Sequence, residues 1–151
     1  MAFNQTREVL NHARQFHRRL SAFYAELKDE TDKERARTLL DYMSRHEQCL
    51  ADSLTAYEEG VKNGVLDTYF KYESEASPLS KITEFEIKPD MDVDDVIAAA
   101  MHFDACLIAF YREMAQRSIS TKVREVFENL LLLEQQEQIG LSKQAVGLGS
   151  L

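Results

Sequence analysis

The sequence has few of the residues that build disulfide-linked or thiolate metal scaffolds. Cys49 and Cys106 are the two cysteines among 151 residues, and they do not form a Cys-x-x-Cys pair. A disulfide framework, a structural zinc site and an iron centre with four cysteine ligands are therefore without support. We expect both cysteines to be small, buried apolar residues.

Long apolar runs and an excess of positive charge are also missing. No segment approaches the ~18–20 apolar residues of a membrane-spanning helix, and the N-terminus lacks the apolar core of a signal peptide, so we expect a cytoplasmic protein with no membrane partner. The net charge of −8 argues against nucleic-acid binding, which needs a basic face. A hydrophobic fraction of 44% suits a single folded domain over residues 1–151.

What the sequence does contain is an internal repeat. Residues 8–58 align without a gap on residues 95–145, at an offset of 87 residues. Two long copies are not a solenoid array, and they predict one helical hairpin that has been duplicated. The identical pairs include Ala13 with Ala100, Phe16 with Phe103, Leu20 with Leu107, Tyr24 with Tyr111 and Glu47 with Glu134.

Apolar residues recur at spacings of three and four in four segments, which predicts four helices. The expected ranges are about 5–29, 32–59, 93–117 and 120–145, and residues 147–150 should fray. The expected boundary signals are a capping box from Thr31 to Glu34, Gly60 at the end of the second helix, Asp92 with Asp95 before the third, and Ser118 or Ser120 before the fourth.

The connections between these helices differ in length. The short turns near Glu30 and Arg117 require antiparallel neighbours. Residues 60–92 form one long connection that holds Pro78 and Pro89, with a short added helix expected over residues 65–72. A long crossover between two hairpins is typical of ferritin-like four-helix bundles. The predicted fold is therefore all-α, a ferritin-like bundle of two antiparallel helical hairpins.

Each predicted helix carries one metal-competent side chain on its apolar stripe. Thirteen residues separate His17 from the first turn and Asp104 from the second, and 17 residues then lead to Glu47 and to Glu134. With a rise of 1.5 Å per residue, these four groups should meet at one level of the bundle. Buried carboxylates are costly unless they are paired or bound to metal, so this level is the candidate site.

The arrangement resembles the rubrerythrin branch of the ferritin-like di-iron carboxylate family over the four helices. That family places a glutamate on two helices and Glu-x-x-His on the other two. Here Glu47 and Glu134 keep the glutamates, but Leu50 and Glu137 replace both histidines, and His17 stands where a glutamate is expected. The metal ligands that the resemblance implies are His17, Glu47, Asp104, Glu134 and Glu137, for one or two iron or manganese ions, with Tyr24 and Tyr111 hydrogen-bonded to the ligands.

The implied function is a ferritin-like metal-binding protein, an oxidoreductase that uses iron or manganese on oxygen or peroxide with an unidentified electron donor. The alternative is a non-catalytic bundle, a dimeric interaction or stress protein with a relic site and no metal. In that case a protonated His17 bridges Glu47 and Glu134, and Asp104 or Glu137 holds a proton. A third interpretation is a bundle that binds a small apolar ligand beside the acidic cluster.

The remaining histidines and one apolar run complete the expectations. His46 precedes Glu47, but its repeat partner is Leu133, which indicates a flanking position, whereas His12 and His102 should be solvated. The Leu130–Leu133 run exceeds one stripe, so the fourth helix should bury a second face. The crossover or a second subunit would cover that face, and we expect a homodimer.

Overall fold

Four long helices make up most of the computed structural model. It describes residues 2–67, 69–73, 92–118 and 120–149, with side chains for 5–67, 92–118, 120–140 and 143. The predicted helical bundle is confirmed. The elements are β1 (Ala2–Gln5), α1 (Thr6–Glu30), α2 (Glu34–Glu59), α3 (Asn63–Leu66), β2 (Tyr69–Glu73), α5 (Val93–Arg117) and α6 (Thr121–Gly149).

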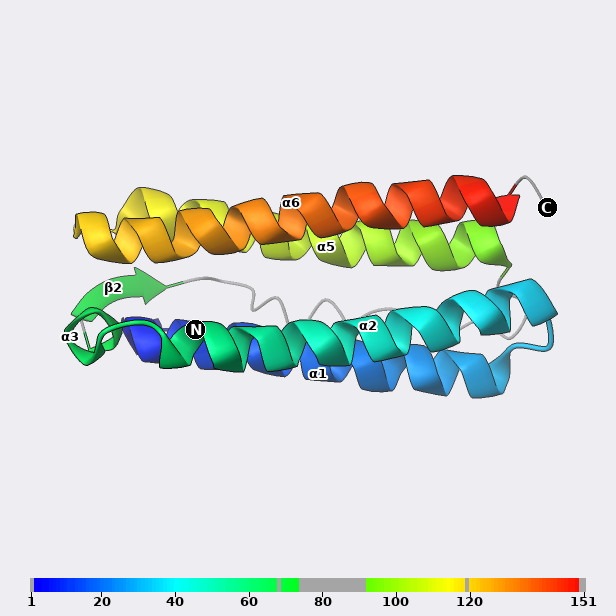
Figure 1. Ribbon diagram of the computed structural model, residues 1–151, viewed down its shortest axis with the longest axis horizontal. Coiled ribbons are helices and arrows are strands. Elements are labelled where there is room, and N and C mark those ends of the chain that lie inside the picture. Colours follow the sequence, from blue (N-terminus) through cyan, green and yellow to red (C-terminus); the bar gives the residue numbers. More distant parts are fainter. Residues whose placement is uncertain (1, 68, 74–91, 119, 150–151) are drawn as a thin grey trace.

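The long helices form two hairpins that lie on one another as two layers (Figure 1). α1 and α2 run antiparallel in one layer, and α5 and α6 run antiparallel in the other. α2 ends at one end of the bundle and α5 begins at the opposite end (Figure 1). The connection between them therefore joins opposite ends, as a long crossover requires. Residues 68 and 74–91 of the predicted crossover lie outside the described residues.

The helix starts follow the predicted signals in two cases of three. Asp92 and Asp95 form a capping box before α5, in which each backbone N–H donates to the other carboxylate, at 3.1 and 2.9 Å. The Ser120 hydroxyl, rather than that of Ser118, accepts from Val123 N at 3.5 Å before α6. The capping box predicted at Thr31 is wrong, because the Thr31 N–H closes the end of α1 and α2 begins without a side-chain cap.

Gly60 follows α2 as predicted, but two other boundaries are wrong. The short helix expected over 65–72 covers only Asn63–Leu66, and Tyr69 begins the strand β2, which pairs antiparallel with β1. Aromatic residues favour strands when a partner strand is present, and here the partner comes from the distant N-terminus. The C-terminal residues 147–149, expected to fray, continue α6 instead.

The core consists mainly of residues that the repeat pairs. Phe16, Phe103, Tyr24 and Tyr111 are all buried, and Phe23 packs edge-on against Phe103 with ring centroids 5.5 Å apart. This contact joins α1 to α5 and so holds the two hairpins together. Burial of each such side chain stabilises the fold by about 1.5–3 kcal/mol.

Several expectations about single residues outside the stripes are wrong. Cys49 is exposed, because it lies on the face of α2 away from the apolar stripe, and Cys106 of α5 is half-buried. His12 is buried instead of solvated, since α5 covers it with Phe110 at 5.7 Å between ring centroids. His102 is exposed as predicted. Leu132 is 55% exposed, so the described residues do not fully cover the second face of α6.

Each described helix is too short or too polar to cross a membrane.

Candidate metal site

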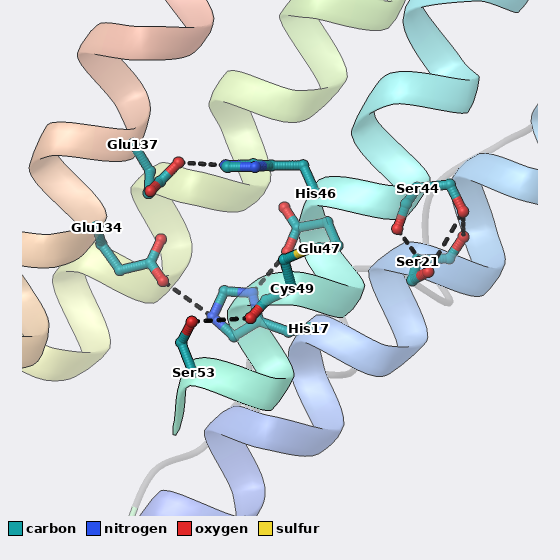
Figure 2. A network of polar contacts seen from close by, with 9 residues as sticks. All are labelled: His17, Ser21, Ser44, His46, Glu47, Cys49, Ser53, Glu134 and Glu137. Carbon is teal, nitrogen blue, oxygen red and sulfur yellow. Dashed lines mark hydrogen bonds and ion pairs between the residues drawn. The ribbon is translucent and has the colours of Figure 1, made fainter. Parts of the chain in front are cut away.

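The centre of the bundle brings one histidine between two glutamates (Figure 2). His17 of α1 places Nδ1 2.5 Å from Glu47 Oε2 of α2 and Nε2 2.9 Å from Glu134 Oε1 of α6. All three side chains are at most 8% exposed. Glu47 and Glu134 are equivalent in the repeat, so the duplication itself presents one carboxylate from each hairpin to the single imidazole.

The charge of this trio follows from its burial. Burial alone would lower the pKa of His17, and it is the largest single effect, but the charges and hydrogen bonds of Glu47 and Glu134 together raise that pKa to about 10. His17 is therefore an imidazolium at neutral pH and donates one hydrogen bond to each glutamate. Burial also raises the pKa of Glu47, and the His17 charge opposes this effect.

Asp104 of α5 lies near the same carboxylates. It is 7% exposed, and burial, followed by the charges of Glu47 and Glu134, raises its pKa to about 8. Its carboxyl group is thus mostly protonated at neutral pH. The neighbouring carboxylates raise this pKa because they repel a third buried negative charge. A bound cation would remove that repulsion.

Glu137 of α6 pairs with His46 of α2 rather than with His17. Glu137 Oε2 contacts His46 Nε2 (Figure 2), and these side chains are 26% and 35% exposed. The ring of His46 stacks on Tyr42, with centroids 5.6 Å apart and planes 8° apart. His46 is the residue that the sequence pattern missed. Its repeat partner, Leu133, gave no signal, and only its position next to Glu47 pointed to the site.

A cavity of about 50 Å³ lies beside Glu47, with lining residues from α1, α2, α5 and α6. This volume exceeds the roughly 30 Å³ that one water molecule occupies in the liquid. The polar side chains of the lining belong to Glu47, Asp104, Glu137, His46, Tyr24 and Tyr42. The lining also includes Leu50, where the resemblance predicts a histidine.

Two buried polar atoms near the trio have no hydrogen-bond partner among the described residues. They are Glu134 Oε2 and the Tyr111 hydroxyl. The hydrogen bond that we predicted from Tyr111 to the ligands is therefore not formed. Tyr111 and Tyr24 nevertheless lie close enough to the acidic groups to be affected by them. Burial, followed by the charges of the nearby carboxylates, raises the pKa of each phenol. An unpartnered buried carboxylate oxygen is costly, and a cation would satisfy it.

The donor set fits a divalent cation that prefers oxygen. Three carboxyl groups and one imidazole line the cavity. Glu134 is outside the lining, but it carries a free buried oxygen, and its charge acts on Asp104. Carboxylates with few nitrogen donors suit magnesium, manganese and iron. In the part of the chain that the structure describes, no three of these side chains already surround one metal position. Binding would therefore require side chains to turn toward the ion.

Comparison of the chain with protein-family models, with curated proteins and with solved structures gives no match.

Proposed function

We propose that this protein is a ferritin-like metal-binding bundle that holds one divalent cation in the cavity beside His17. The observation that carries the proposal is the excess of buried acid. Glu47, Glu134 and Asp104 are each at most 7% exposed and lie near a single imidazolium. One cation bound by Asp104 and the free oxygen of Glu134 would compensate the negative charge that His17 leaves unbalanced.

His17 takes the place of a second metal ion in this proposal. Both of its ring nitrogens face carboxylate oxygens, so neither offers a lone pair to a metal. A fixed imidazolium between two glutamates supplies the positive charge that a metal ion supplies in the di-iron family. We therefore assign the ligand role to Glu47, Asp104, Glu134 and Glu137, and a charge-balancing role to His17.

The side chains have separate tasks in metal binding. Asp104 must release its proton, because its pKa of about 8 keeps it mostly neutral at pH 7. Glu47 is held by His17, so its position is set before the ion arrives. Iron or manganese bound here would supply the one-electron chemistry toward oxygen or peroxide that the family resemblance implies.

The test is a titration of the protein with Mn²⁺ and with Fe²⁺ under anaerobic conditions, followed by calorimetry and by elemental analysis. We expect one ion per chain and a loss of at least about tenfold in affinity in Glu47→Gln/Asp104→Asn. Asp52→Asn is the matched control, since Asp52 is an exposed acid on the same helix as Glu47. Equal binding by the double variant and the control would refute the proposal. Oxygen or peroxide consumption by iron-loaded protein then tests turnover.

A non-catalytic bundle with a relic site is the second candidate. The observation that favours it is the His17 bridge, because the hydrogen bonds to Glu47 and Glu134 partly satisfy the site without metal. In this case the purified protein binds neither ion above the level of Glu47→Gln/Asp104→Asn, and metal does not raise its melting temperature. The expected homodimer stays a prediction, and light scattering of the purified protein tests it.

A further inference from the structure

His46 brings a nitrogen donor to the cavity from a position that the family pattern does not use. It lies directly before Glu47 on α2, and its ring lines the cavity together with Glu47, Asp104 and Glu137. Leu50, at the position where the resemblance predicts a histidine, lines the same cavity but has no donor atom. The nitrogen that is missing at Leu50 is therefore present one helical turn earlier on the same helix. Unlike His17, whose two ring nitrogens both face buried carboxylates, His46 contacts one partly exposed carboxylate.

The surroundings of His46 direct its Nε2 atom toward α6. Tyr42 is four residues before His46, so the two rings lie on the same face of α2 and stack. This stacking restricts the imidazole plane, and Nε2 contacts Glu137 Oε2 across the gap between α2 and α6 (Figure 2). A nitrogen and a carboxylate oxygen from two helices thus already contact each other, and a cation would bind by separating this exposed pair and taking a ligand from each side.

The exposure of the lining residues divides the cavity into an inner and an outer part. Glu47 and Asp104 are 6% and 7% exposed, whereas the side chains of His46 and Glu137 are 35% and 26% exposed. The outer pair therefore lies at the mouth, where side chains can turn without unfolding a helix. The inner pair is fixed by packing.

We propose that His46 is a ligand of the cation, binding it with Glu137 from the mouth while Glu47 and Asp104 bind it from the interior. This assignment rests on the proposed function. An imidazole in the set changes the metal preference, because nitrogen favours cobalt, iron and zinc over magnesium. The protein should therefore bind Co²⁺ more tightly than Mg²⁺, and His46 should be the cause.

The experiment compares Co²⁺ and Mg²⁺ binding in wild type, His46→Gln and His102→Gln. His102 is an exposed histidine on α5 and serves as the control. We expect His46→Gln to lose at least about tenfold in Co²⁺ affinity and to change the visible spectrum of bound Co²⁺, with the Mg²⁺ affinity changed by less than about threefold. His102→Gln should match the wild type in all three measurements.

The outcomes separate the failure of this inference from the failure of the proposed function. If wild type binds neither metal, both are wrong. If wild type binds Co²⁺ and His46→Gln has the same affinity and spectrum, or weakens Co²⁺ and Mg²⁺ equally, His46 is not a ligand while the metal site stands. Tyr42→Ala is a second variant, which keeps the imidazole but removes the stacked ring. It should weaken Co²⁺ binding by less than His46→Gln, and an unchanged Co²⁺ affinity in both variants contradicts the assignment.

Discussion

Replacement of His17 by leucine removes the cation that lies between two buried glutamates. Removal of one partner from a buried ion pair costs about 3–5 kcal/mol, because the remaining charges lose their compensation. The elevation of the His17 pKa from 6.5 to about 10 gives a similar size, roughly 5 kcal/mol at ~1.4 kcal/mol per pH unit. The His17 side chain is 2% exposed, so solvent does not screen this effect. For a domain of this length, we expect the melting temperature to fall by roughly 6–20 °C.

The stability that His17 contributes should decrease with rising pH. Native His17 keeps its proton up to about pH 10, whereas the unfolded chain releases it near 6.5. The stabilisation by His17 is therefore complete below pH 6.5 and is lost as the pH rises toward 10. Urea unfolding followed by circular dichroism between pH 6 and 10 should show this loss in the wild type. His17→Leu should be less stable at pH 6.5 and should lack the decrease between pH 8 and 10.

Two further variants distinguish lost charge compensation from lost packing. His12→Leu changes a buried histidine on the same helix, but burial lowers the pKa of His12, so it carries no charge at neutral pH. It should leave the slope between pH 8 and 10 unchanged. His17→Leu combined with Glu47→Leu and Glu134→Leu should recover most of the stability, because no charge remains in the trio. Wild-type stability and slope in His17→Leu would refute the account of the trio.

Other predictions concern Asp104 and the start of α5. The pKa of Asp104 is about 8, against 3.8 for an ordinary aspartate, so Asp104 makes the wild type less stable as the pH rises from 3.8 to 8. Asp104→Asn should reduce that slope in the same urea assay. An unchanged slope would contradict the raised pKa of Asp104. A cation bound by Asp104 must displace the proton of that carboxyl group, so Mn²⁺ affinity should rise between pH 6 and 8. Calorimetry in buffers of different ionisation enthalpy should detect the released proton. Binding without proton release would contradict the ligand role of Asp104. Asp92→Ala should cost about 1 kcal/mol in thermal unfolding, and Asp94→Ala, which removes the same charge but no capping box, should cost less; equal losses would argue against the cap.

The sequence predicts the bundle well because its signals are local. Helical stripes depend on spacings of three and four residues, and the repeat shows that the same stripe occurs twice. The equal sequence distances from the turns to His17 and to Asp104 predict that the polar groups lie at one level of the bundle. In the structure His17 does contact both glutamates.

What the sequence does not predict depends on contacts between distant segments. Tyr69 forms a strand because β1 lies beside it, and no local pattern encodes that pairing. His46 reaches the cavity because α6 presents Glu137 opposite it, whereas the repeat pairs His46 with a leucine. Thr31 closes α1 instead of starting α2, a competition between two helix ends that spacing alone does not decide.

The position of a bound ion decides whether the cavity is a cation site. Crystals grown with Mn²⁺, measured for anomalous scattering, should contain one peak per chain in the cavity lined by Glu47, Asp104, Glu137 and His46. His17 should remain between Glu47 and Glu134 in the same crystal. A pair of ions with His17 as a ligand, or the absence of any peak in the cavity, would contradict the account.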